Sequence, residues 1–117
     1  MEEGDGQMKK MCFISQPMAG LDYAEILLMR AQIAECINKL DCSVCTSMQD
    51  SRLGSQLSIS KSIDDLLSCD AIVMAQNWEN FRGCRIEKYI ADQYHMPVFY
   101  YSQQLDCLIG PNKGFVL

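Results

Sequence analysis

Short apolar segments alternate with longer segments of helical periodicity along most of this chain. The clearest apolar segment, 71–75 (Ala-Ile-Val-Met-Ala), is not interrupted by a polar residue, which is typical of a strand buried on both faces of a sheet. Strands that alternate with helices predict a parallel sheet with helices on both of its faces. We therefore expect an α/β fold with a parallel sheet of about four to five strands.

The expected boundaries follow from the apolar spacing and from the residues that begin and end helices. The expected strands are 8–15, 42–46, 70–75 and 97–101, and the expected helices are 22–40, 57–68 and a third that opens at Gly83. Asp22 and Glu25 form a capping pattern at the first helix. We expect a disordered tail at 1–7, a polar loop at 48–56, and a C-terminal tail with little periodicity at 102–117 that is a candidate subunit contact.

Length and charge narrow the class of protein. A chain of 117 residues is the usual size of one domain, so we expect a single domain over 1–117. The chain has ten Lys and Arg residues and fifteen Asp and Glu residues, and this acidic balance argues against binding to the phosphate backbone of DNA or RNA. The apolar runs are much shorter than the ~20 residues of a membrane-spanning helix, and the first ten residues lack the apolar core of a signal peptide. We expect a cytoplasmic protein that binds neither a nucleic-acid polymer nor a membrane.

Seven cysteines are many for this length, but their number is odd and most lie in apolar segments. In a cytoplasmic protein this pattern predicts reduced, partly buried thiols. Cys42 and Cys45 form a C-x-x-C pair, yet no second cysteine pair has zinc spacing and the one histidine, His95, is distant in sequence. We expect no metal and no other cofactor, and a structural role for His95.

Ligands of parallel α/β sheets bind beyond the carboxyl ends of the strands, where the strand order reverses. This rule selects two loops, 15–22 and 76–85. The first begins Ser-Gln-Pro-Met-Ala-Gly and leads into a helix N-terminus, whose free N–H groups favour an anion. A tight turn between a strand and a helix accounts for Pro17 and Gly20 without any ligand.

The second loop and the helix after it carry more candidate chemistry. Within ten residues lie Trp78, Glu79, Asn80, Arg82, Arg85 and Glu87. We expect Glu87 in about the first turn of the helix, where the helix dipole keeps a carboxylate ionised and able to attack a sugar carbon. A capping role is the alternative for Glu87. Trp78 either stacks on a base or ribose or covers the core, and the two arginines either hold a phosphate or lie solvated on the surface.

Two segments resemble the nucleoside 2-deoxyribosyltransferase superfamily. Residues 13–20, Phe-Ile-Ser-Gln-Pro-Met-Ala-Gly, resemble its opening strand and loop. Residues 70–91, with the motif W-E-x-x-R-G-C-x-I-E at 78–87, resemble a short branch of the superfamily found in bacteria and their phages. The resemblance covers 11–101 and implies a Rossmann-like, flavodoxin-like fold, a nucleoside or nucleotide ligand, and a homodimer or larger even oligomer.

The resemblance also implies roles for particular residues. Glu87 matches the glutamate that is the nucleophile at the anomeric carbon in the characterised enzymes. The base and sugar contacts of the opening loop fall on Ser15, Gln16 and Met18, and the phosphate donors of the monophosphate-hydrolysing relatives fall on Asn80, Arg82 and Gly83. The predicted substrate-binding set is Ser15, Gln16, Met18, Gly20, Ser62, Trp78, Asn80, Arg82, Gly83 and Arg85.

The chain departs from the characterised enzymes at two places. They carry an Asp where this chain has Ser62, and an acid shortly before the nucleophile, where this chain has Glu79, Asn80 and Phe81. Cleavage requires a group that protonates the leaving base, so Glu79 or a neighbouring subunit must supply it, or the chemistry is absent.

Three hypotheses follow. The first is cleavage or transfer of the N-glycosidic bond of a (deoxy)nucleoside or its monophosphate, with Glu87 as nucleophile and Glu79 as acid/base. The second is a non-catalytic protein that sequesters a nucleotide, for example a signalling nucleotide. The third is an interaction module without a small ligand.

Overall fold

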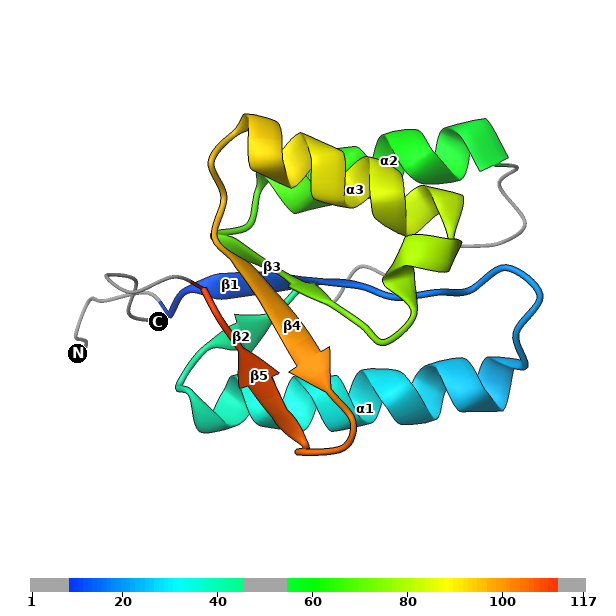
Figure 1. Ribbon diagram of the computed structural model, residues 1–117. Helices are drawn as coiled ribbons and strands as arrows, with labels where there is room; N and C mark the ends of the chain where they lie inside the picture. The colour runs from blue at the N-terminus through cyan, green and yellow to red at the C-terminus, as the bar shows by residue number, and fades with distance from the viewer. Residues whose placement is uncertain (1–8, 46–54, 112–117) are drawn as a thin grey trace, which may run out of the picture.

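The computed structural model of the chain describes residues 9–45 and 55–111 (Figure 1). In chain order the elements are β1 (Met11–Ser15), α1 (Tyr23–Lys39), β2 (Ser43–Val44), α2 (Ser55–Leu67), β3 (Ala71–Met74), the 3-10 helix η1 (Trp78–Asn80), α3 (Arg82–Gln93), β4 (Val98–Ser102) and β5 (Cys107–Ile109). The expected alternation of strands and helices is confirmed. None of the helices in the described ranges is both long and apolar enough to cross a membrane.

The five strands form one sheet in the order β2-β1-β3-β4-β5. The pairs β1–β2, β1–β3 and β3–β4 are parallel, and β4–β5 is antiparallel. The order 2-1-3-4-5 is that of flavodoxin-like folds, so the expected Rossmann-like α/β class is confirmed. Because β1 pairs with β2 on one side and β3 on the other, the strand order reverses between β1 and β3.

Helices cover both faces of the sheet, with α1 on one face and the pair α2 and α3 on the other (Figure 1). Each face has its own core, because successive side chains of a strand point to opposite faces. The α1-side core contains Cys12, Ile14, Ile33, Cys36, Ile37, Cys42, Ala71, Val73, Ala75, Phe99 and Tyr101. The α3-side core contains Phe13, Leu66, Cys69, Ile72, Met74, Cys84 and Ala91.

The structure corrects several boundaries. The expected polar loop at 48–56 loses its last two residues to α2, which begins at Ser55, and the loop at 76–82 contains η1. Asp22 is the N-cap residue of α1, but its side chain makes no capping hydrogen bond. Within the described residues the second strand spans only 43–44. The expected tails at 1–7 and 112–117 and the loop at 48–54 lie outside the described residues.

The largest correction concerns the expected tail after β4. Residues 107–109 form β5, which returns along β4 in register Tyr101↔Leu108. The Tyr101 hydroxyl donates a hydrogen bond of 2.9 Å to Asp106 Oδ1 across the turn. A three-residue strand is too short to show an alternating pattern, and its pairing partner forms it rather than its own sequence.

Candidate functional site

The centre of the candidate site is the carboxylate of Glu87, which two buried serines hold. Ser15 Oγ donates a hydrogen bond of 2.6 Å to Glu87 Oε1, and Ser62 Oγ donates to Glu87 Oε2. The two serines are 1% and 2% exposed, while Glu87 itself is half-buried. Each carboxylate oxygen therefore has one hydroxyl donor, and together they fix the plane of the carboxylate.

Three separate elements bring these side chains together. Ser15 is the last residue of β1, and it follows Phe13 on the α3 side of the sheet because strand side chains alternate. Ser62 lies one turn before the fully buried Leu66 on the inward face of α2. Glu87 lies one turn before the buried Ala91 on the inward face of α3. The cluster depends on tertiary packing, because Ser62 is 25 residues and Ser15 is 72 residues from Glu87 in the chain.

The Glu87 cluster lies where the fold rule places a ligand. Ser15 is at the carboxyl end of β1, and β1 and β3 are the two strands between which the order reverses. Helix α3 follows β3 and begins near this edge of the sheet (Figure 1). Its residue Glu87 contacts Ser15, the last residue of β1. We expected a ligand site near the reversal of strand order, and the Glu87 cluster lies at that edge of the sheet.

The structure places Glu87 beyond the first turn of α3, so the influence of the helix dipole on its carboxylate is weaker than expected. Helix α3 begins at Arg82, so Glu87 is in its second turn, and the field of the dipole is strong only in the first. Burial raises the pKa of Glu87 above its ordinary value of 4.5, and the hydrogen bonds from Ser15 and Ser62 lower it. The hydroxyl groups of Ser15 and Ser62 support the negative charge of the carboxylate.

Cys84 completes the cluster and was missed as a site residue from the sequence. It lies three residues before Glu87, hence on the same face of α3, and is 3% exposed. Burial raises the pKa of its thiol to about 11, a side-chain hydrogen bond shared with Ser15 lowers it, and the charge of Glu87 raises it. Cys84 is therefore a neutral thiol at neutral pH, and it places no second charge beside Glu87.

The loop after β1 divides its side chains between the two faces. Gln16 is buried, and its Nε2 donates a hydrogen bond of 3.0 Å to the Ile26 carbonyl of α1, on the face opposite Glu87. Met18 is half-buried, and its carbonyl accepts the Leu21 N–H at 3.1 Å in a turn. Gly20 has a φ of +78°, which favours glycine. The structure therefore brings Ser15, and not Gln16, to the Glu87 carboxylate.

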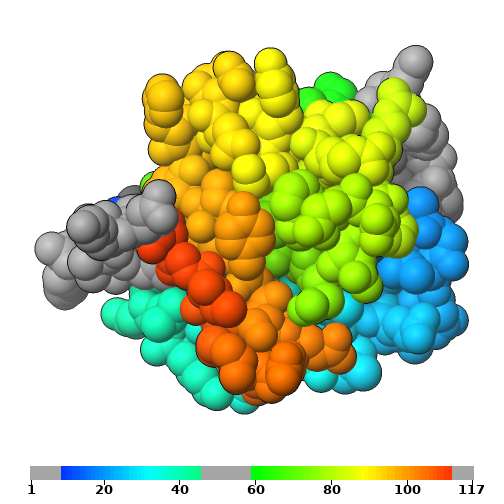
Figure 2. Space-filling view, in the orientation of Figure 1, coloured from blue at the N-terminus to red at the C-terminus, as the bar shows by residue number. Residues whose placement is uncertain are grey.

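The segment before α3 lies against the α3-side core. Trp78 is half-buried there, and its ring centroid is 6.3 Å from that of Tyr100. Figure 2 shows the yellow-green surface of η1 and the start of α3 next to the orange surface of β4. Arg85 Nη1 donates a hydrogen bond of 2.9 Å to the Glu79 carbonyl and so fixes η1 to α3. Trp78 thus has the core-covering position that the sequence left as one of two alternatives.

The remaining predicted residues lie outside the hydrogen-bonded cluster. Glu79, Asn80 and Arg82 are exposed, and so is Arg85. Gly83, one turn before Glu87, is half-buried, and a Cβ built on it would meet no heavy atom within 4 Å. This open space adjoins the first turn of α3, one turn before the carboxylate of Glu87.

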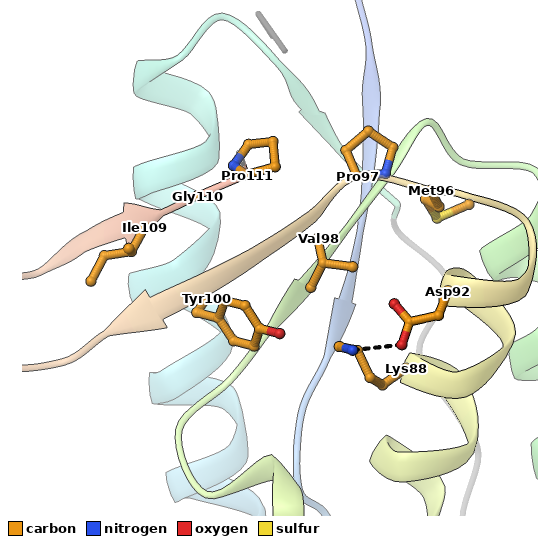
Figure 3. A pocket seen from close by; sticks show the side chains of 9 residues that line it. All are labelled: Lys88, Asp92, Met96, Pro97, Val98, Tyr100, Ile109, Gly110 and Pro111. Carbon is orange, nitrogen blue, oxygen red and sulfur yellow. Dashed lines mark hydrogen bonds and ion pairs between the residues drawn. The ribbon is translucent and has the colours of Figure 1, made fainter. Parts of the chain in front are cut away.

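A separate hollow of about 610 Å³ lies on the β4 side of α3 (Figure 3). It is lined by Lys88, Asp92, Met96, Pro97, Val98, Tyr100, Ile109, Gly110 and Pro111. Lys88 Nζ lies 2.6 Å from Asp92 Oδ2 and 5.8 Å from the Trp78 ring centroid. None of the predicted site residues lines this hollow, so it is distinct from the Glu87 cluster.

The C-x-x-C pair does not form a binding site for a metal. Cys42 belongs to the α1-side core, whereas Cys45 packs against the α3-side core. Residues three apart in extended chain point to opposite faces, so the two thiols diverge. Within 9–45 and 55–111 no group of three metal-ligating side chains is present.

Fold and site together define an α/β protein with a Rossmann-like sheet and a serine-held glutamate at the reversal of strand order. The chain belongs to the family described as "Domain of unknown function (DUF4406)", whose model matches residues 10–100. This match includes all three members of the hydrogen-bonded cluster. Comparison with curated proteins and with solved structures finds no match.

Proposed function

We propose that this protein cleaves or transfers the N-glycosidic bond of a (deoxy)nucleoside or its monophosphate, with Glu87 as the nucleophile. One observation supports the proposal most directly: the Glu87 carboxylate is half-buried at the reversal of strand order and is oriented by Ser15 and Ser62. A carboxylate held in this way is oriented for attack and is only partly solvated, which favours its reaction with an electrophilic carbon. The resemblance of 78–87 to the superfamily motif supports the same role.

The proposed reaction has two steps. A Glu87 oxygen bonds to the anomeric carbon as the bond from that carbon to the base nitrogen breaks, and the electron pair goes to the base, which takes up a proton. The oxygen of water, or the nitrogen of a second base, then attacks the same carbon, loses its proton to solvent and releases the Glu87 carboxylate. We propose Glu79 or a residue of a partner subunit as the group that protonates the base.

We propose that the residues just before Glu87 in the chain bind the substrate. Gly83 leaves open space one turn before the carboxylate. Asn80 and Arg82 are close to Gly83 in sequence, and their side chains are exposed, so they can contact a phosphate group of the substrate. We also propose a cytoplasmic location and a homodimer or larger even oligomer for the chain.

Binding without cleavage is the second candidate, and one observation favours it. Glu79 has an exposed side chain, and its carbonyl accepts the hydrogen bond from Arg85. Burial and the two serine hydroxyls account for the shifted pKa of Glu87, with no contribution from another carboxylate in the described part of the chain. A protein that captures a nucleotide without cleaving it needs no acid.

One incubation separates the two candidates. The protein is mixed with nucleosides, mononucleotides and cyclic nucleotides, and mass spectrometry is applied to the mixture and to its protein-free filtrate. Free base in the mixture supports cleavage, and an intact compound missing from the filtrate supports capture. Glu87→Gln should abolish base release, while the control Glu35→Gln, an exposed position on α1, should retain it. Undiminished base release by Glu87→Gln would rule out the nucleophile.

A further inference from the structure

The charged side chains near Glu87 indicate which kind of leaving group suits the proposed reaction. The acidic side chains on the neighbouring elements are engaged elsewhere or exposed. Asp65 on α2 lies 3.6 Å from Lys61 Nζ, and its Oδ2 is buried without a hydrogen-bond partner in the described residues; Asp65 makes no contribution to the pKa of Glu87. Asp92 on α3 lies 2.6 Å from Lys88 Nζ. Asp64 is exposed, as is Glu79.

Asp70, the residue before β3, accepts the Met11 N–H at 2.7 Å and is exposed. The remaining ionisable neighbour, the Cys84 thiol, has a pKa of about 11 and is a weak acid. The described part of the chain therefore positions no carboxylic acid at Glu87 that would protonate a leaving base.

The cations near Glu87 are paired elsewhere or exposed. Lys61 and Lys88 pair with aspartates on their own helices, and Arg85 donates to the Glu79 carbonyl. Arg82 is exposed at the start of α3. When it is ionised, the Glu87 carboxylate is thus partly desolvated, and its hydrogen-bond donors in the described residues are neutral hydroxyls. A partly buried charge without an opposite charge is costly, and a cationic ligand relieves that cost.

We propose that the Glu87 site acts on N-glycosides whose base is already a cation, namely N-ribosylpyridinium compounds and N7-alkylated purine nucleosides. The inference rests on the proposed function. When the bond from the anomeric carbon to the base nitrogen breaks, the electron pair neutralises the positive charge, and the base leaves as a neutral molecule. Water then supplies the hydroxyl of the free sugar and releases one proton to solvent. The reaction needs the carboxylate but no acid.

The experiment compares two substrates that differ by one methyl group at N7, which gives the base its positive charge. 7-Methylguanosine and guanosine are incubated at pH 6 with the wild-type chain, and each rate of base release is divided by the rate in buffer alone. Because the half-buried carboxylate attracts the cationic base and this base leaves without taking up a proton, we expect a larger acceleration for 7-methylguanosine than for guanosine. Nicotinamide riboside should be cleaved as well, and Glu87→Gln should abolish both activities while Glu35→Gln retains them.

Inhibition provides a second readout that involves no cleavage of the probe. 1-Methylnicotinamide carries the positive charge but no glycosidic bond, and neutral nicotinamide is its matched control. We expect the cation, and not the neutral compound, to slow the cleavage of nicotinamide riboside.

The outcomes separate this inference from the proposed function. Equal accelerations of guanosine and 7-methylguanosine would overturn the preference for a cationic base and leave the proposed cleavage in place. Absence of cleavage in both substrate classes would overturn the proposed cleavage and this inference with it. Inhibition by nicotinamide equal to that by 1-methylnicotinamide would show that charge does not determine binding.

Discussion

The hydroxyl of Ser62 on α2 donates a hydrogen bond to Oε2 of Glu87 on α3, so one buried contact joins the two helices on this face of the sheet. The contact links stability to the candidate chemistry, because the same hydroxyl orients the carboxylate and lowers its pKa.

Replacing Ser62 by alanine should destabilise the fold. The half-buried carboxylate of Glu87 loses one of its donors, and because an unsatisfied, fully buried polar group costs ~1–3 kcal/mol, we expect a loss toward the lower end of that range. Urea unfolding at pH 7 measures the loss. Ser60→Ala, at an exposed position of the same helix, is the control and should change the free energy of unfolding by less than ~0.5 kcal/mol. Equal effects of the two variants would contradict the role of Ser62.

Glu87→Gln should change how stability depends on pH. Because the pKa of Glu87 is raised in the folded chain, the folded state binds more protons than the unfolded state between pH 4.5 and the raised pKa. The stabilisation by Glu87 is fully present below pH 4.5 and is lost as the pH rises through the folded pKa. The stability of Glu87→Gln relative to wild type should therefore increase from pH 4.5 upward.

Urea unfolding at several pH values between 4 and 8 tests this sign. The control Glu35→Gln should run parallel to wild type across the range. A stability difference between Glu87→Gln and wild type that is constant with pH would show that Glu87 titrates normally in the folded chain.

Gly83 allows stability and ligand access to be separated. Because a Cβ at this helical position meets no neighbouring atom, Gly83→Ala should raise the free energy of unfolding by ~0.4–1 kcal/mol. Gly83→Leu fills the open space near Glu87 and should reduce base release or ligand capture without loss of stability. Thermal unfolding and the nucleotide incubation measure the two effects. Unchanged activity in Gly83→Leu would show that the ligand does not approach over this glycine.

The cleavage of nicotinamide riboside should depend on one ionisation. The rate should rise as Glu87 loses its proton, at a pH above 4.5, and then stay level, because no acid has to keep its proton. Initial rates from pH 4 to 9 give the profile. A bell-shaped profile would indicate a second, acidic group, supplied by Glu79 or by a partner subunit.

The mass of the protein in solution tests the proposed assembly. Light scattering after size-exclusion chromatography should give a mass of two or a larger even number of chains, each of 13.3 kDa. A single-chain mass at working concentration would contradict the homodimer, and it would leave Glu79 as the candidate acid.

Apolar periodicity was sufficient to predict most of the fold. The uninterrupted run at 71–74 and the helical spacing of 23–39 encode β3 and α1 locally, because burial on both faces and amphipathicity leave direct marks in a sequence. The sequence of β5 shows no such pattern, because its three residues acquire strand geometry only by pairing with β4.

For the site, the sequence by itself determined the candidates, and the tertiary structure decided which of them meet. The motif at 78–87 made Glu87 the candidate nucleophile, and the reversal of strand order pointed to its location. Packing of α2 and α3 on the sheet brought Ser15 and Ser62 to its two oxygens, and left Glu79 exposed. The tertiary structure also determined the pKa shift of Glu87, because burial and hydrogen bonds act through space between residues that are distant in the chain.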